Sequence, residues 1–265
     1  MICSAKNKPK NKEGGFQMPR SKRFFMPGYA WHITQRCHNR EFLLKFKCDK
    51  QRWLELLFHA KERFDLSILN YAVTSNHIHL LVVDKRYDRS IAWALHFVAG
   101  RMAWEYNKRK NRRGAYWEDR YHATAVETDK YLLECAVYID LNMVRAGVVN
   151  HPAEWEFCGY QEILGLKKRN GLIDKDLLCH YYCMKDPKNL GRFYRAVIEE
   201  KIMQERLERE SRWTDAIAVG SKRFAERFIQ DLGMKARNRN IKITGGSRNS
   251  YQIEEGEIHF LASKS

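Results

Sequence analysis

The chain has 265 residues, 44% of them hydrophobic, and a formal net charge of +16 from 48 Lys and Arg against 32 Asp and Glu. This length accommodates one large domain, or one medium domain with an appendage. No run of about 18 apolar residues or apolar signal core is present, so we expect neither a membrane span nor a signal peptide. The charge favours a polyanionic partner, most often nucleic acid, although a ribosome-bound or membrane-surface protein has the same signature.

The first 22 residues are polar and rich in lysine, and we expect them to form a flexible basic arm. Its composition fits direct DNA contact and a solvated tail equally. The seven cysteines are scattered, and no second Cys or His pair follows Cys179 and Cys183 at zinc-finger spacing. This cysteine usage is typical of reduced thiols and predicts a cytoplasmic protein.

Periodic patterns predict alternating strands and helices after the arm. Residues 29–36 are aromatic and β-branched and predict a strand, followed by a helix over 49–64 with Asp49 as its N-cap. Residues 66–73 predict a second strand. The short turn at 74–76 then predicts that the strand starting at His77 returns as an antiparallel hairpin.

The next part of the chain continues in the same way. A helix opens at Asp88 or Ser90 and runs into the basic loop 107–114, and residues 117–126 contain a further strand. Thr128 or Asp129 caps a last helix that extends to about Arg145. Such an order of elements predicts an α+β fold, an antiparallel sheet with helices packed mainly on one face.

The sequence after Gly165 predicts a mostly helical extension of mixed charge, with helices over 172–184 and 189–210 and a third helix capped by Ser221. A helix-turn-helix around Gly220 is one interpretation, and an ordinary packing helix is the other. Residues 235–250 predict a loop, and 251–261 predict a terminal strand or an extended tail. We therefore expect three parts: a basic arm over 1–22, a domain over 23–165, and an accessory region over 166–265, for which DNA binding is one option.

A histidine pair lies at the head of the hairpin strand. Alternate side chains of a strand share a face, so His77 and His79 project from the same side of the sheet. Two imidazoles on one face make half of a divalent-metal site, and a phosphodiester is a natural partner for such a metal in a basic protein. The alternative is two hydrogen-bonded histidines at a sheet surface.

The helix over 129–145 carries a polar stripe beside an apolar one. Tyr138 and Asn142 lie four residues apart and therefore share the polar stripe. If the apolar stripe docks on the sheet, both side chains can reach over the histidine face. The alternatives are a tyrosine at the margin of the core and an asparagine in a helix-end hydrogen bond. The apolar stripe consists of Leu132, Ala136, Ile139 and Met143.

Four motifs in order resemble those of the REP-associated tyrosine transposases, a one-tyrosine family of the HUH superfamily. They are the segments 28–36, 76–81, 117–122 and 138–147, and the resemblance spans roughly residues 19–165. The chain departs from the family at Met143, where proline is usual, and at Cys37, where glycine often stands.

The resemblance implies a ferredoxin- or RRM-like HUH fold and a metal-dependent endonuclease and strand transferase. The enzyme would act on single-stranded DNA at palindromic hairpins through a 5′-phosphotyrosine intermediate. Tyr138 would be the nucleophile. His77, His79 and Asn142 would hold one Mg²⁺ or Mn²⁺, with His122 or a water as the substitute for Asn142.

Other assignments stay open. Tyr131 and then Tyr121 are the next candidates for the nucleophile. The fold also serves catalytically inactive nucleic-acid-binding regulators. A relaxase or rolling-circle initiator shares the chemistry but usually has a third histidine or a second nearby tyrosine. We expect single-stranded or hairpin DNA as the partner, with no membrane and no small-molecule substrate, in the bacterial cytoplasm at the nucleoid. The protein would be a monomer or a homodimer.

Arginines in the arm, in the first strand and around the basic loop are candidates for phosphate contacts, whose strength falls with salt. Tyr116 and Trp117 are candidates for stacking on unpaired bases. Each arginine on its own also fits a solvated charge. The candidate DNA-binding residues are Arg20, Arg23, Arg36, Arg40, Arg109, Arg112 and Arg120.

Overall fold

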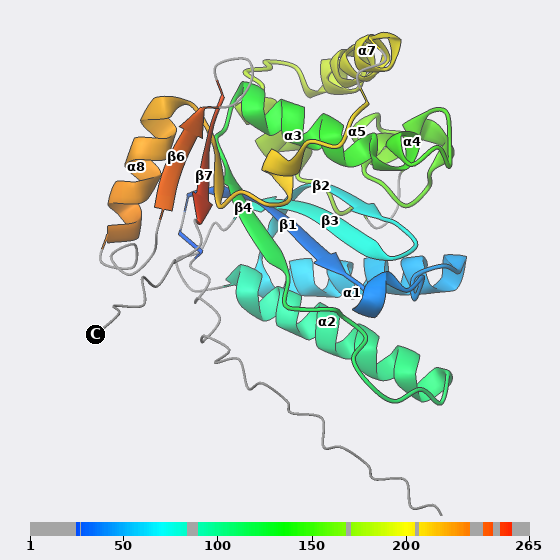
Figure 1. Cartoon of the computed structure of the whole chain (residues 1–265). Helices are drawn as coiled ribbons and strands as arrows, with labels where there is room; N and C mark the ends of the chain where they lie inside the picture. Colours follow the sequence, from blue (N-terminus) through cyan, green and yellow to red (C-terminus); the bar gives the residue numbers. More distant parts are fainter. Residues whose placement is uncertain are drawn as a thin grey trace, which may run out of the picture.

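A seven-stranded sheet with the order β2-β3-β1-β4-β5-β7-β6 forms the centre of the chain in the computed structural model (Figure 1). The strands are β1 Ala30–Arg36, β2 Ser67–Val73, β3 His77–Val83, β4 His122–Val126, β5 Ala218–Gly220, β6 Ile241–Gly245 and β7 Tyr251–Glu255. The structure describes residues 25–26, 28–83, 90–167, 171–204, 207–233, 241–245 and 250–255. The arm over 1–22 therefore lies outside the described residues.

The hairpin predicted from the sequence is confirmed. β2 and β3 pair antiparallel, and β1 lies between β3 and β4, antiparallel to both. β2 is buried along its whole length and β3 along all but its first residue. Both faces of these strands are therefore buried, which explains why the apolar run after His79 is continuous.

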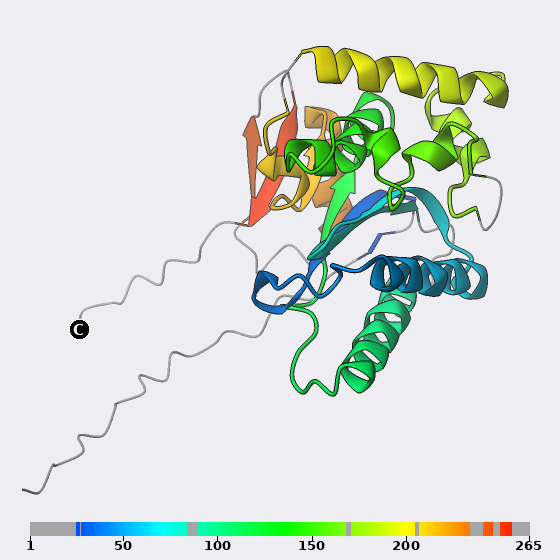
Figure 2. The same ribbon diagram turned by 90° about the vertical axis from the view of Figure 1, so that its right-hand side faces the viewer.

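Helices cover both faces of this sheet (Figures 1 and 2). α1 Lys47–Phe64 and α2 Ser90–Arg109 pack together on one face, while α3 Lys130–Asp140 lies across the other. The α+β class and the mostly antiparallel sheet are confirmed, but the helices are not mainly on one face. The remaining helices are α4 Asn142–Arg145, α5 Tyr160–Ile163, α6 Lys175–Tyr181, α7 Leu190–Met203 and α8 Lys222–Leu232.

One expectation about a helix end is wrong, and one predicted helix is divided although it ends at Arg145 as predicted. α1 begins at Lys47 with Phe46 as its N-cap, and Asp49 lies inside its first turn, where its buried carboxylate pairs with Arg109. The helix predicted over 129–145 is divided at Leu141, whose φ of −79° and ψ of 4° are not helical. The divided helix keeps its direction.

Backbone hydrogen bonds explain why the helix keeps its direction across Leu141. The Leu141 amide donates to the Val137 carbonyl at 3.0 Å, and the Arg145 amide donates to the Leu141 carbonyl at 2.9 Å. These i to i−4 bonds carry the chain across the division.

The C-terminal region adds three strands to the helices α6, α7 and α8, which hold most of its described residues in regular structure. β5 pairs parallel with β4 and antiparallel with β7, which joins the region to the central sheet. Because Ala218–Gly220 is a strand, the helix-turn-helix interpretation is wrong. Ser221 caps α8 as predicted, accepting the Phe224 amide at 3.1 Å. The proposed boundary after residue 165 stays a prediction. No helix among the described residues is both long and apolar enough to span a membrane.

α3 is anchored to β2 and α7 by a buried polar network. Asp140 Oδ2 accepts from the Tyr194 hydroxyl at 2.6 Å and from Asn70 Nδ2 at 3.0 Å. Burial raises the Asp140 pKa from 3.8 to about 7, although these hydrogen bonds act in the opposite direction. The folded protein therefore binds a proton that the unfolded chain releases near pH 4.

Because of this extra proton, Asp140 destabilises the fold as pH rises from about 4 to about 7, by up to a few kcal/mol. We expect Asp140→Asn to remove this contribution. The measurement is the free energy of unfolding in urea across pH 4–8, for both proteins. All other residues are common to the two proteins, so the difference isolates Asp140. An unchanged pH dependence in the variant would contradict the assignment.

Candidate functional site

One face of the central strands is unusually polar. Residues paired across antiparallel strands share a face, and Thr34 pairs with both His79 and His122, while Arg36 pairs with His77. His32 lies two residues before Thr34 and therefore projects to the same side. α3 covers this face, since the ring centroid of Tyr138 is 6.1 Å from that of His79. The predicted shared face of the two histidines is thus present, with ring centroids 5.0 Å apart.

His77 is oriented by the turn that precedes its strand. Its Nδ1 lies 2.7 Å from Asn76 Oδ1 and 2.9 Å from Thr74 Oγ1. Thr74 Oγ1 also accepts the amides of residues 76 and 77, which fixes the turn. Because a carboxamide oxygen only accepts, we assign the ring proton of His77 to Nδ1. This leaves Nε2 with its lone pair available to a ligand.

His79 lies deeper and is enclosed by two side chains. Its Nδ1 is 2.9 Å from His32 Nε2, and its Nε2 is 3.0 Å from Asn142 Nδ2. His32 Nδ1 in turn lies 2.8 Å from the carbonyl oxygen of Trp213. The predicted reach of Asn142 over the histidine face is therefore observed, although Leu141 divides the helix that carries it.

His32, His77 and His79 are uncharged at neutral pH. Burial lowers the pKa of His32 to about 3 and that of His77 to about 4, with Arg36 adding to the effect at His77. Burial and the neighbouring imidazoles lower the pKa of His79 well below its ordinary value. Metal ligation requires the neutral imidazole, so these ligands need lose no proton near pH 7.

The donor atoms fit a small divalent cation. The 3.0 Å between His79 Nε2 and the Asn142 amide matches the separation of adjacent ligands around an ion with bonds of about 2.1 Å. Rotation of the amide about its last bond would present Oδ1 in place of Nδ2. Among the described residues, no group of three or more His, Cys, Asp or Glu forms a metal site. The candidate set is two imidazoles and one amide, which leaves positions open for phosphate.

Tyr138 is held by its neighbours in α3 and α4. Its side chain is 5% exposed, and burial raises its pKa, while the cations Arg145 and Arg209 oppose the rise. The Arg145 guanidinium carbon lies 4.0 Å from the ring centroid, and its Nη2 donates to the Tyr138 carbonyl at 2.7 Å. The phenol therefore starts neutral, with a cation against its ring.

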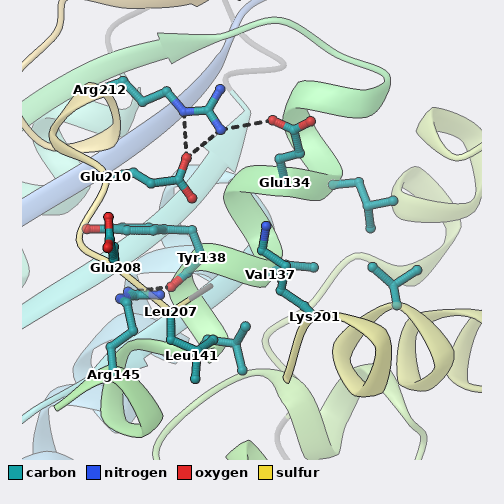
Figure 3. A pocket seen from close by; sticks show the side chains of 12 residues that line it. Glu134, Val137, Tyr138, Leu141, Arg145, Lys201, Leu207, Glu208, Glu210 and Arg212 are labelled. Carbon is teal, nitrogen blue, oxygen red and sulfur yellow. Dashed lines mark hydrogen bonds and ion pairs between the residues drawn. The ribbon is translucent and has the colours of Figure 1, made fainter. Parts of the chain in front are cut away.

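A pocket of about 110 Å³ lies beside Tyr138, lined by α3, α4, α7 and the segment 207–212 (Figure 3). Its lining includes both acidic and basic side chains. Arg212 bridges Glu210 at 2.5 Å and Glu134 at 3.1 Å, whereas Arg145 faces the tyrosine. The segment 207–212, which follows α7, thus forms one wall of the pocket beside Tyr138.

Some arginines predicted to contact DNA are engaged within the protein. Arg109 pairs with Asp49, and Arg112 donates to the Ala115 carbonyl at 2.9 Å in the basic loop. Arg40 and Arg120 are exposed, and Arg36 is partly exposed beside His77. Arg20 and Arg23 lie outside the described residues. DNA contact by these arginines stays a prediction.

The alternative residues occupy other places. Tyr131 is buried seven residues before Tyr138, which is about 10 Å along the helix axis. Tyr121 is stacked on Phe25, with centroids 5.8 Å apart. His122 Nε2 is 3.0 Å from the Ala216 carbonyl oxygen. Tyr116 is 2% exposed, so the expectation that it is an exposed stacking residue is wrong.

Sequence reasoning left three neighbours of the site without a role: His32, Arg145 and Trp213. The first two lie in the quoted motifs, and the spacing of His32 on its strand places it on the metal face. For Trp213, no pattern in the sequence indicates a contact with a residue 181 positions earlier.

The α+β sheet sets a histidine pair against a tyrosine on a helix, as the periodicity of the sequence predicts. Residues 26–142 match the model of the family described as "Transposase IS200 like". The family is one of transposases, which are DNA-processing enzymes. No curated protein matches the chain.

Two solved structures are similar to parts of the chain. One is a REP-associated tyrosine transposase bound to a REP hairpin, with 18% identity, a TM-score of 0.45, and coverage of 57% of this chain and 89% of the other. The second is a putative transposase from Deinococcus radiodurans R1, with 13% identity, a TM-score of 0.33, and coverage of 49% and 92%.

Proposed function

We propose that the protein cuts and rejoins single-stranded DNA at hairpin-forming palindromes, as a REP-associated tyrosine transposase does, through a 5′-phosphotyrosine intermediate. The observation that carries this proposal is the convergence of Tyr138, Asn142 and two neutral histidines on one face of the sheet. The match of residues 26–142 to the model of the IS200-like transposase family supports it.

His77, His79 and Asn142 would hold one Mg²⁺ or Mn²⁺. Both Nδ1 atoms have hydrogen-bonding partners elsewhere, so Nε2 of each histidine is the candidate ligand atom, and Nε2 of His79 faces the amide of Asn142. When bound, such an ion supplies a Lewis acid for a phosphate oxygen and charge that favours the phenolate.

Tyr138 would act as the nucleophile. Its phenolic oxygen gives up its proton to solvent and attacks phosphorus in line, the bond from phosphorus to the 3′ oxygen breaks, and that oxygen takes up a proton from solvent to become a free 3′-OH. An ordinary phenol has a pKa of about 10. Arg145, against the ring, opposes the rise that burial produces. Attack of another 3′-OH on the phosphotyrosine reverses the step, so rejoining needs no ATP.

His32 does not favour the relaxase alternative. A third histidine ligand would need a free ring nitrogen, but Nε2 of His32 is within hydrogen-bonding distance of His79 and Nδ1 is bonded to the Trp213 carbonyl. Tyr131, the candidate second nucleophile, lies two turns away. An inactive regulator would not need a neutral histidine pair beside a tyrosine.

The direct test is incubation of the protein with Mn²⁺ and single-stranded oligonucleotides that fold into imperfect hairpins. A 3′-end label should appear on a protein band in a denaturing gel, because the 5′ end of that fragment is joined to tyrosine. A 5′-end label should instead yield a shorter free strand. The same sequence annealed into a full duplex is the control. Strand cleavage without labelled protein would overturn the proposal.

Asn142 is the ligand with the weakest intrinsic affinity, because its amide is uncharged. We expect Asn142→Ala to weaken Mn²⁺ binding about tenfold or more, and Asn142→Asp, which keeps an oxygen in place, to retain it. Isothermal titration calorimetry at constant pH measures both. Unchanged affinity in the alanine variant would remove Asn142 from the ligand set.

A further inference from the structure

Two buried histidines of the candidate metal face, His32 and His79, are in hydrogen-bonding contact. The rings of His32 and His79 are nearly parallel, 10° apart, with centroids separated by 5.1 Å. His79 Nδ1 and His32 Nε2 are 2.9 Å apart, and His32 Nδ1 is 2.8 Å from the Trp213 carbonyl oxygen. Both side chains are buried, so neither contact is exchanged for water.

The carbonyl oxygen of Trp213 determines which ring nitrogen of His32, and then of His79, carries the proton. It can only accept, so His32 must carry a proton on Nδ1. With one proton on each ring, His32 Nε2 is then an acceptor, and the facing Nδ1 of His79 must donate. The proton of His79 is therefore on Nδ1, and its Nε2 presents a lone pair toward Asn142.

We propose that His32 is a positioning residue that, backed by the Trp213 carbonyl, fixes the tautomer and ring orientation of His79 for metal binding. This inference rests on the proposed function, since it assumes that His79 Nε2 is a metal ligand. Metal-binding histidines commonly donate their other N–H to a carbonyl or carboxylate, which orients the ring. Here a second imidazole transmits the effect of the carbonyl.

The source of the carbonyl gives the C-terminal region a part in the site. Trp213 ends the short 3₁₀ helix Ser211–Trp213, and its side chain is fully buried. The hydroxyl of Thr124 on β4 donates to the Ala216 carbonyl at 2.7 Å, three residues further on. The segment is thereby fastened to the polar face of the sheet at the point where His32 needs its acceptor.

The first measurement uses the metal-free, full-length protein labelled with ¹⁵N-histidine. Long-range ¹H–¹⁵N spectra distinguish the two neutral tautomers, with His79→Gln serving to assign its signals. We expect His79 with its proton on Nδ1 in the wild type. A proton on His79 Nε2 would overturn the proposal, whatever the protein does with DNA.

The second measurement is Mn²⁺ affinity by calorimetry for two variants of His32. His32→Phe keeps the ring volume but removes the acceptor, and we expect a loss of about 10- to 100-fold. His32→Gln retains an acceptor oxygen and a donor, and we expect it to restore most of the affinity. His59→Phe is the matched control, because His59 is exposed on α1, which lies on the other face of the sheet.

The two proposals fail in different ways. If the wild type binds no Mn²⁺, the proposed function fails, and the tautomer spectrum still decides whether the line of hydrogen bonds exists. If the wild type binds Mn²⁺ and a folded His32→Phe variant binds it equally well, the role of His32 fails while the metal site stands. If His32→Phe does not fold, the comparison of His32→Gln with His32→Asn decides. A shorter side chain should lose the contact with His79 and hence the affinity; equal affinities would overturn the role.

Discussion

Replacement of Tyr138 by phenylalanine should abolish the covalent protein–DNA adduct while leaving hairpin binding within about twofold of the wild type. The substitution removes only the phenolic oxygen, which is the atom that would form the bond to phosphorus. The ring contacts to His79 and Trp213 involve the aromatic face, with centroid separations of 6.1 and 6.2 Å, and are retained. The measurements are a denaturing gel for the adduct and a native titration for binding.

The matched control is Tyr131→Phe, on the same helix and also buried. It should form the adduct at the wild-type rate. An adduct that survives in Tyr138→Phe would remove Tyr138 as the nucleophile. If that adduct disappears in Tyr131→Phe instead, the earlier tyrosine carries the chemistry.

The His79→Ala variant should lose at least about 100-fold in Mn²⁺ affinity, and its cleavage should fall to background. Substitution of a residue that hydrogen-bonds to a metal ligand typically lowers metal affinity about 10- to 100-fold. The His79→Ala substitution removes a ligand itself, so we expect a loss at least as large. His79 on β3 also contacts Asn142 through Nε2 and His32 through Nδ1. Its loss therefore removes the donor and the acceptor of two further hydrogen bonds.

His59→Ala provides the control for metal binding by any surface histidine, since His59 is exposed on α1, which lies on the other face of the sheet. It should bind Mn²⁺ as the wild type does. Circular dichroism and thermal unfolding report whether His79→Ala keeps its fold. Wild-type Mn²⁺ affinity in a folded His79→Ala protein would show that the metal binds elsewhere.

Short-range periodicity accounts for what the sequence could predict. Alternation in a strand is enough to place His77 and His79 on one face, and 100° per residue is enough to bring Tyr138 and Asn142 to one side of a helix. Strand β1, the hairpin and the capping of α8 by Ser221 follow from equally local signals. Each depends on residues within a few positions of one another.

Long-range contacts explain the rest. Asp49 was a reasonable N-cap by local rules, but its pairing with Arg109 places it inside α1 instead. The segment Ala218–Gly220 is too short to predict a strand, and β4 and β7 supply the partners that make it one. His32 could be placed on the metal face from its spacing, yet its role depends on Trp213, which no local pattern connects to it.

The dependence of His32 on Trp213 also bears on the order in which the site is completed during synthesis. All three proposed ligands and the tyrosine lie within the first 142 residues of the chain, whereas the carbonyl behind them arrives 71 residues after Asn142. A nascent or truncated chain that ends before Trp213 has every reactive group but not the support that orients His79. Competence to cut DNA would then be withheld until most of the polypeptide has left the ribosome.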